Sequence, residues 1–243
     1  SLYEALYGLG RFESPLNQLL GTRPQGCEIA LTIDAKAQKM ATELMYRKCG
    51  AVVALDPRDG AVRVMVSAPD YDPQTVLASA DSYRALVEDP DAPELNRALL
   101  GQYAPGSVLK ILTAAAALDA GAAQSEEEFR CEGHTTIGHA EIKCRLEKGH
   151  GTVTLQEAFS DSCNVVFAQL GAQLGPERFP EYVSRFHLLE RPGLPLPGKD
   201  GQMAPMNGAD AEAQVAEAAF GQGATLVSPV QIARMAATIA NGG

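Results

Sequence analysis

The chain has 243 residues, of which 46% are hydrophobic and 21% are charged, and its formal net charge at pH 7 is −10. This composition predicts one folded globular domain, or most of one, with enough apolar material for a core. The acidic balance excludes a basic surface for nucleic acid, and no run of 18 apolar residues occurs, so we expect any membrane anchor to lie outside this sequence.

The domain is expected to begin after a connector. Residues 1–26 have no strong periodicity and end in the Gly- and Pro-spaced stretch GTRPQG, which is typical of a linker from a preceding region. Residues 27–243 would then form the domain. Thr32 or Asp34 can cap its first helix, which Gly50 can end. The apolar residues of that helix recur at helical spacing: Ala37, Met40, Ala41, Leu44 and Met45.

A hairpin and a surface excursion are expected next. The β-rich runs AVVAL at 51–55 and AVRVMVS at 61–67 are joined by DPRDG, whose turn residues predict an antiparallel hairpin. From residue 69 to residue 93 the chain is polar, acidic and interrupted by prolines. This pattern predicts a surface excursion with about one helical turn near residues 79–87.

The rest of the chain is expected to be mostly helical. The helix that begins at Ser107, SVLKILTAAAALDAG, is apolar on nearly all sides, which is typical of a central helix. The last helix has the strongest signals, with Ser228 as its cap, Pro229 at its first position and Gly242 just past its end. Residues 191–208 are too rich in Pro and Gly for a regular element. Further helices are expected at residues 154–159, 164–174, 176–187 and 211–219.

The five cysteines cannot all pair within the chain: Cys27, Cys49, Cys131, Cys144 and Cys163. Cys131 and Cys144 flank a short segment that is expected to form a hairpin around Gly138, and a disulfide between them would indicate an oxidising compartment. Free thiols are one alternative. A zinc site that uses Cys131, His134, His139 and Cys144 is the other. Cys49 and Cys163 lie beside apolar residues and are interpreted as small core residues.

Ser107 and Lys110 are candidates for a nucleophile and its base. A serine hydroxyl is a weak nucleophile and needs a base held against it, and residues three apart in a helix share a face. Burial would disfavour the ammonium form of Lys110 and allow it to accept the serine proton. The structural alternative is that Ser107 caps the helix and Lys110 extends to solvent. Taken alone, the Ser-x-x-Lys spacing favours this alternative, because the pattern is common by chance.

A second polar motif makes a catalytic role for Ser107 and Lys110 more favourable than a structural one. Within TLQEAFSDSCNVVFAQLG, residues 154–171, Ser162 and Asn164 lie between two predicted helices. A helix cap formed by Ser160, Asp161 or Ser162 is the simplest interpretation. Only one polar side chain is needed for the cap, so two polar groups of this stretch would be left without a structural role. In an active site they would relay a proton and hold an amide.

The segments that contain these two motifs, together with the start of the predicted domain and its last helix, resemble in their order the transpeptidase domain of class B penicillin-binding proteins. The resemblance extends from about Cys27 to Gly243. The Ser-x-x-Lys motif followed by a second serine motif belongs to the known signature of penicillin-binding proteins and β-lactamases. The segments that carry the resemblance are LTIDAKAQ, GAVVALDPRDGAVRVMVSAPDYDP, NRALLGQYAPGSVLK, GTVTLQEAFSDSCNVVFAQLG and FGQGATLVSPVQIARMAATIANGG.

The resemblance implies a fold and a set of catalytic roles. The fold would be α/β (α+β), the penicillin-binding protein and serine β-lactamase-like fold, with a helical subdomain and an antiparallel sheet. Ser107 would be the acylated nucleophile, Lys110 its general base, and the backbone N–H of Ser107 half of an oxyanion hole. Ser162 would pass a proton to the departing amine, and Asn164 would bind the backbone of the peptide.

The implied reaction is cell-wall cross-linking without a cofactor or a metal. The D-Ala-D-Ala end of a peptidoglycan stem peptide would acylate Ser107, and an amine of a neighbouring stem would take the acyl group. β-Lactams would acylate the same serine. The protein would act on the extracytoplasmic face of a bacterial cell membrane, anchored there in its full-length form, with cell-wall synthases as partners.

One departure from the family pattern concerns its third motif. No Lys-Thr-Gly or Lys-Ser-Gly occurs in the sequence. We therefore expect a truncated domain that lacks its C-terminal strands and has little activity by itself. A serine β-lactamase, a β-lactam sensor and a non-catalytic scaffold fragment are the alternatives. The Ser-Asp-Ser at residues 160–162 does not match the Ser-Asp-Asn motif of one β-lactamase class, whereas the reading from Ser162 fits transpeptidases.

Overall fold

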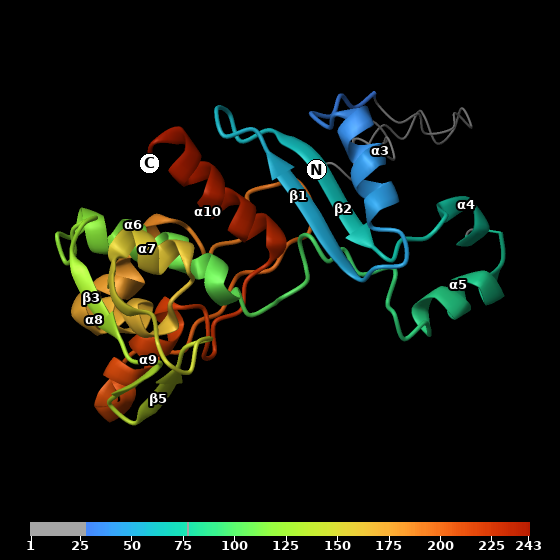
Figure 1. The fold of residues 1–243 in the computed structure, drawn as a ribbon. Helices are drawn as coiled ribbons and strands as arrows, with labels where there is room; N and C mark the ends of the chain where they lie inside the picture. Colours follow the sequence, from blue (N-terminus) through green and yellow to red (C-terminus); the bar gives the residue numbers. More distant parts are fainter. Residues whose placement is uncertain (1–27, 77) are drawn as a thin grey trace.

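The computed structural model describes residues 28–76 and 78–243. The predicted connector, residues 1–26, lies outside the described residues. One lobe contains the β1–β2 hairpin with α3, α4 and α5, and the other contains α6 to α9 with short strands; α10 lies between the two lobes (Figure 1). The chain thus combines a helical lobe with antiparallel strands, as the sequence predicts.

The first lobe confirms the predicted helix and hairpin. The helix α3 spans Ala35–Leu44, and Asp34 caps it by accepting hydrogen bonds from two backbone N–H groups at 2.9 and 3.0 Å. The strands β1 (Gly50–Leu55) and β2 (Val62–Ala68) pair antiparallel, with Gly50 opposite Ala68. The helix α3 packs on β2, where Ala41 joins the buried side chains of the strand.

The helix α3 differs from its prediction in length and burial. It ends at Leu44 rather than near Gly50, and Met40 and Leu44, predicted on its apolar face, are 59% and 65% exposed. Helical periodicity therefore located the helix without showing how much of its apolar face would be covered. The predicted surface excursion contains two short helices, α4 (Pro73–Val76) and α5 (Ala80–Val87).

The second lobe confirms the predicted helices. The segment from Ser107 begins as a 3-10 turn, η2, and continues as the α-helix α6. Residues predicted as two helices form α8, whose backbone leaves helical geometry at Gly175 (φ 77°) just before Pro176. The elements of this lobe are η2 (Gly106–Leu109), α6 (Lys110–Asp119), α7 (Leu155–Ser160), α8 (Asn164–Arg185), η3 (Gly208–Asp210) and α9 (Ala211–Ala219).

Short strands connect these helices. The predicted hairpin around Gly138 is present as β4 (His134–Ile137) and β5 (Ala140–Lys143). A second antiparallel pair, β3 (Glu128–Cys131) and β6 (Gly151–Thr154), was not predicted. Each of its strands has four residues and its partner is distant in sequence, so alternation along one strand is too short to reveal the pair.

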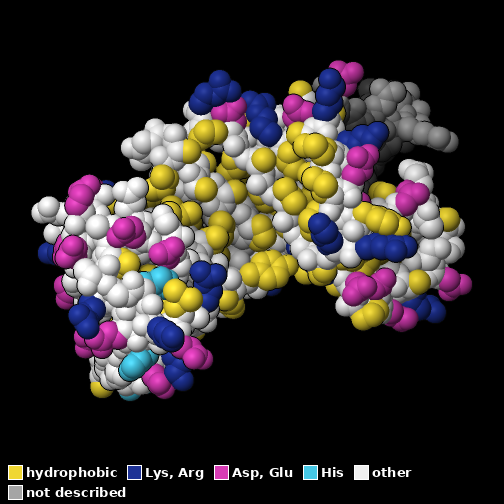
Figure 2. Space-filling view, in the orientation of Figure 1, with side chains coloured by type: hydrophobic (Ala, Val, Ile, Leu, Met, Phe, Trp, Pro, Cys, Tyr) yellow, Lys and Arg dark blue, Asp and Glu magenta, His cyan; other side chains and the backbone are white. Residues whose placement is uncertain are grey.

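The last helix, α10 (Pro229–Asn241), confirms its predicted start and end. Ser228 precedes Pro229, and Gly242 follows the helix with a left-handed φ of 95°. Packing of α10 on β1 joins the two lobes. Figure 2 shows hydrophobic side chains gathered over the middle of the molecule, and every residue of β1 is partly exposed. Across residues 28–76 and 78–243, no helix combines the length and apolarity that a membrane crossing requires.

A glycine-rich segment after α9 fixes the turn that precedes Ser107. The backbone N–H of Gly106 donates to the carbonyl of Gly221 at 3.0 Å, and Tyr103 exchanges two backbone hydrogen bonds with Val227, both 2.9 Å. Thr113 of α6 donates its hydroxyl to the carbonyl of Ala219 at 2.7 Å. Gly221 has a φ of 83°, and a Cβ at this position would overlap the backbone of Gly106.

Replacing Gly221 with alanine is expected to lower the free energy of unfolding by about 2–4 kcal/mol, because left-handed strain and overpacking against Gly106 add. Gly208 is the matched control, since its φ is 73° and nothing lies near a Cβ there. Gly208→Ala should cost only the backbone strain, about 1–2 kcal/mol. Urea unfolding of the two variants measures the difference, and equal losses would contradict the close approach.

Candidate active site

The side chain of Lys110 is buried at the start of α6 and hydrogen-bonded at its ammonium end. It is 2% exposed. Its Nζ donates to the carbonyl oxygen of Ser162 at 2.7 Å, to Ser162 Oγ at 3.0 Å and to Asn164 Oδ1 at 2.7 Å. These three acceptors use all three N–H groups of an ammonium. The structure therefore brings Lys110 together with both residues of the second motif.

Burial, two neighbouring cysteines and an aromatic ring all act on the charge of Lys110. Burial lowers the pKa of Lys110 from its usual 10.5 to about 8, while the Cys163 and Cys144 side chains oppose the shift. Nζ also lies 5.5 Å from the centre of the buried Phe167 ring, which favours the ammonium form. A lysine with this pKa can hold or release a proton near neutral pH, as a general base must.

Ser107 lies on the exposed side of the same turn. It belongs to η2, three residues before Lys110, and its side chain faces solvent. The capping position of η2 is occupied by Pro105, and that of α6 by Leu109, so Ser107 is not a helix cap. The structural alternative for this motif is therefore wrong at both positions, because Lys110 does not extend to solvent either. Among the described side chains, none forms a hydrogen bond with Ser107 Oγ.

Ser162 connects α7 to α8 in an unusual backbone conformation. Its φ is 55°, in the left-handed region that residues other than Gly rarely adopt. This conformation directs both its carbonyl oxygen and its Oγ at Lys110. The capping position of α8 is occupied by Cys163, which makes no side-chain cap bond, so the predicted cap by Ser160, Asp161 or Ser162 is wrong for this helix.

Asn164 links Lys110 to the strand β5. Its Oδ1 accepts from Lys110, and its Nδ2 donates to the carbonyl of Lys143 at 3.0 Å. The amide has two N–H groups, so one remains available for another acceptor. Asn164 is thus fixed in orientation and still able to bind a carbonyl oxygen.

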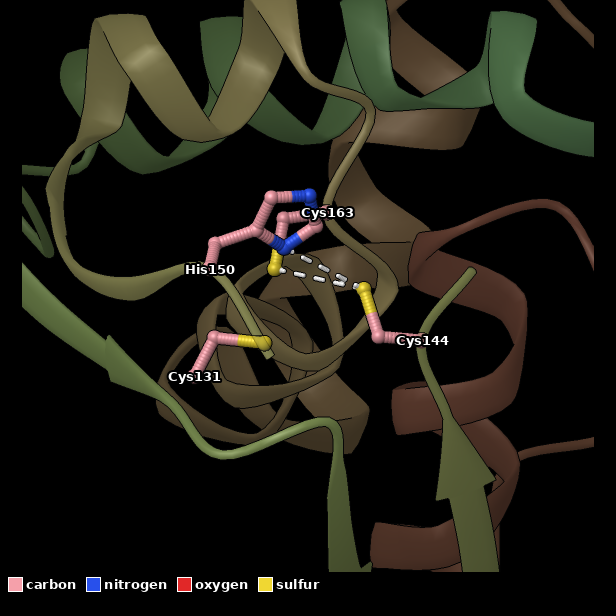
Figure 3. A group of neighbouring side chains, drawn as sticks. All are labelled: Cys131, Cys144, His150 and Cys163. Atoms are coloured by element: carbon pink, nitrogen blue, oxygen red, sulfur yellow. Dashed lines mark hydrogen bonds between the residues drawn. The ribbon is translucent and has the colours of Figure 1, made fainter. Parts of the chain in front are cut away.

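Three cysteines and a histidine converge directly behind this loop (Figure 3). Cys131, Cys144 and Cys163 are free thiols, so the predicted disulfide between Cys131 and Cys144 is wrong in this structure. The Cys144 sulfur is instead 3.4 Å from His150 Nδ1 and 3.8 Å from the Cys163 sulfur. The Cys144 sulfur thus has two close neighbours, a histidine nitrogen and a second sulfur, rather than one disulfide partner.

The histidines named in the zinc alternative do not take part in this cluster. His139 pairs with Asp210 at 3.0 Å, and His134 is exposed in β4. The prediction that Cys49 and Cys163 are small core residues is confirmed for Cys163, which is fully buried, and wrong for Cys49, which is exposed. Sequence reasoning did not place Cys163 or His150 in a cluster with Cys131 and Cys144. The available signal was the spacing Cys-x12-Cys-x5-His-x12-Cys, which ends inside the Ser162-Cys163-Asn164 motif.

Comparison with known proteins identifies the family. Residues 50–243 match the penicillin-binding protein transpeptidase domain. The peptidoglycan D,D-transpeptidase PbpA of Mycolicibacterium smegmatis is 36% identical over 241 residues, which cover 92% of this chain and 48% of that protein. This chain therefore belongs to the family of penicillin-binding protein transpeptidase domains, and it spans about half the length of this curated relative.

Solved structures of similar proteins support the same assignment. The ceftriaxone acyl-enzyme complex of penicillin-binding protein A from Mycobacterium tuberculosis has a TM-score of 0.83 and 32% identity, covering 98% of this chain and 56% of that chain. Pseudomonas aeruginosa PBP2 in complex with WCK 5153 also has a TM-score of 0.83, with 31% identity, covering 90% of this chain and 53% of that chain.

The left-handed backbone of Ser162 predicts that glycine is more stable than alanine at this position, which is the reverse of their order in a helix. Ser162→Gly and Ser162→Ala both remove Oγ, but only glycine relieves the strain, so Ser162→Gly should be more stable than Ser162→Ala by about 1 kcal/mol. At Ser160, the last residue of α7, the order should reverse, because glycine is less favourable than alanine where the backbone is helical. Urea unfolding of the four variants tests this, and the same order at both sites would contradict the assigned conformation.

Proposed function

We propose that this protein is a peptidoglycan D,D-transpeptidase that forms an acyl-enzyme at Ser107. The observation that carries the proposal is Lys110, which is buried one turn behind an exposed serine and hydrogen-bonded to Ser162 and Asn164. Membership of the transpeptidase family and the activity of the similar PbpA protein support the same reaction. The proposed substrate is the D-Ala-D-Ala end of a stem peptide, and β-lactams would react with the same serine.

In the proposed first step, Ser107 Oγ forms a bond to the carbonyl carbon and its proton passes to Lys110 Nζ. The backbone N–H of Ser107 would stabilise the oxyanion. This step needs the neutral amine, whose lone pair can accept a proton, and burial of Lys110 favours that form. The hydrogen bond from Ser107 Oγ to Lys110 Nζ would form when substrate binds, since hydrogen bonds between catalytic groups are often long before that.

Ser162 is proposed to carry the proton to the leaving group. Its Oγ lies 3.0 Å from Lys110 Nζ, so a proton taken from Ser107 can move to Ser162 and on to the amine of the departing D-Ala as the C–N bond breaks. An amine from a second stem peptide then attacks the ester carbonyl. A new amide bond forms as the bond to Ser107 Oγ breaks, and the proton that the attacking amine loses returns to Ser107 through Lys110.

Asn164 is proposed to position the peptide. One N–H of its amide donates to Lys143, so the second can donate to a carbonyl oxygen of the substrate backbone. Because Oδ1 is held by Lys110, the amide cannot flip without losing that bond. The same contacts that orient the base would therefore orient the substrate.

The proposed setting follows from the substrate. Peptidoglycan is assembled outside the cytoplasm, so we place the protein on the extracytoplasmic face of a bacterial membrane, where cell-wall synthases would be its partners. Residues 27–243 would belong to the transpeptidase domain and residues 1–26 to the connector before it.

Labelling of the complete gene product with a fluorescent penicillin tests the nucleophile. Ser107→Ala should abolish the label, because no bond to the acyl group can form, whereas Ser160→Ala, on the exposed surface of α7, should retain it. Mass spectrometry of the labelled peptide should place the adduct on Ser107. An adduct on another residue, or label retained by Ser107→Ala, would refute the assignment. Loss of label within seconds would instead favour a β-lactamase.

The rate of acylation is expected to rise with pH through the pKa of Lys110, about 8. Below that value the ammonium cannot accept the proton, so the rate should fall about tenfold for each pH unit. Lys110→Arg, which stays protonated, should be inactive throughout the range. The groups around Lys110 are Ser162, Asn164, Cys144 and Cys163. Stopped-flow penicillin acylation measures the profile, and a rate independent of pH from 6 to 9 would contradict the role of the base.

A further inference from the structure

Four side chains that the acyl-transfer proposal does not use surround a single point. They are Cys131, Cys144, His150 and Cys163, and their ligand atoms all lie within 4.8 Å of one another. Figure 3 shows three sulfurs and Nδ1 of the imidazole ring turned toward the space between them. The three cysteines are buried. We propose that this cluster binds one divalent zinc ion.

The spacing of the ligand atoms agrees with tetrahedral coordination. Zinc–sulfur bonds of about 2.3 Å and zinc–nitrogen bonds of about 2.0 Å imply S···S separations of about 3.8 Å and S···N separations of about 3.5 Å. The Cys144 and Cys163 sulfurs are 3.8 Å apart, and the Cys144 sulfur is 3.4 Å from His150 Nδ1. A Cys3His set is one of the common structural zinc sites.

A disulfide, an iron–sulfur cluster and simple apolar packing fit the four side chains less well than zinc does. A disulfide requires a sulfur–sulfur bond of about 2.05 Å and would leave the third thiol and the histidine without a role. An iron–sulfur cluster needs space between its cysteines for several iron and sulfide atoms, and the 4.8 Å limit leaves room for one ion only. Apolar packing of three thiols gives no reason for Nδ1 of a histidine to face them.

Three segments of the chain carry these ligands, because Cys144 and His150 lie at the two ends of the loop between β5 and β6. Cys131 ends β3, Cys144 follows β5, His150 precedes β6, and Cys163 occupies the cap position of α8. The loops that carry Cys131 and His150 touch through their backbones, because a Cβ at Gly149 would overlap the carbonyl of Cys131. Gly149 has a φ of 75°, so the residue before the ligand histidine requires glycine for both reasons.

The proposed ion would control the position of the second motif. Cys163 is the residue between Ser162 and Asn164, and Cys144 follows Lys143, whose carbonyl holds the amide of Asn164 at 3.0 Å. Coordination would therefore tie the Ser162–Asn164 loop to β3, β5 and the His150 loop at one point. Metal loss would release the loop that orients Lys110. The proposed effect of the metal on the active site depends on the proposed acyl transfer, whereas the proposal that the cluster binds zinc does not.

Cobalt substitution tests the site without any assay of activity. Protein stripped of metal under reducing conditions should bind one equivalent of Co²⁺ and show the visible bands of tetrahedral cobalt with a thiolate charge-transfer band, which Zn²⁺ then displaces. Cys131→Ser and His150→Ala should each weaken cobalt binding at least about tenfold. The matched controls are Cys49→Ser and His134→Ala, which leave the cluster intact and should bind as the wild type does.

Several results would overturn the proposal. They are the absence of a tetrahedral cobalt spectrum, unchanged affinity in both ligand variants, and less than about half an equivalent of zinc after purification with zinc present. A disulfide between any two of the three clustered cysteines in protein isolated under reducing conditions would do the same. If Cys131→Ser fails to fold, reversible removal of zinc from the wild type by a chelator, with a lower melting temperature in the metal-free form, tests the same point.

Penicillin acylation of the complete gene product tests the link to the active site. Metal-free wild-type protein should be acylated at least about tenfold more slowly, and added zinc should restore the rate. Equal rates with and without metal would refute control of the loop. Ser107→Ala should still bind cobalt while taking no label, so failure of the acyl-transfer proposal and failure of the metal site give different results.

Discussion

The buried ammonium group of Lys110 is the constraint on which the arrangement of the active site depends. A charged group removed from water must be hydrogen-bonded, because an unpaired buried charge costs several kcal/mol (about 3–5 where one partner is removed). Lys110 donates three hydrogen bonds, and Ser162 and Asn164 accept all of them. For one residue to offer both its carbonyl and its hydroxyl, the backbone at Ser162 adopts a left-handed conformation. The strain in that loop thus follows from the lysine it surrounds.

Two separate backbone supports position the reacting groups. For the nucleophile, the segment after α9 holds the turn before Ser107 through a hydrogen bond between Gly106 and Gly221, and a Cβ at Gly221 would overlap the backbone of Gly106. On the side of the second motif, β5 holds Asn164 through the carbonyl of Lys143, and the cysteine cluster lies behind the same loop. The nucleophile and the base are therefore supported by separate parts of the chain. A change in either support would move one group relative to the other.

Elements with strong local signals could be predicted from the sequence. Asp34 caps α3, the hairpin forms around the DPRDG turn, the break in α8 falls at Gly175, and Gly242 ends α10. Each of these features depends on a few neighbouring residues. Features that depend on distant partners were missed or misassigned, such as the β3–β6 pair and the exposure of Met40 and Leu44. The disulfide prediction was wrong for the same reason, because the fold brings Cys163, 19 residues further along the chain, next to Cys144.

The sequence by itself determined the positions of the helices, the caps of α3 and α10, the turns, and the Ser-x-x-Lys and Ser-x-Asn motifs with their family. Tertiary structure decided what these motifs do together. Lys110 and Ser162 are 52 residues apart, and their hydrogen bonds exist only because α6 and α8 pack side by side. The fold also gathers Cys131 from the end of β3, Cys144 and His150 from the loop between β5 and β6, and Cys163 from the start of α8. Local periodicity and turn chemistry act over a few residues, whereas a buried charge or a cluster of ligands is satisfied by whichever groups the fold brings within hydrogen-bonding or bonding distance.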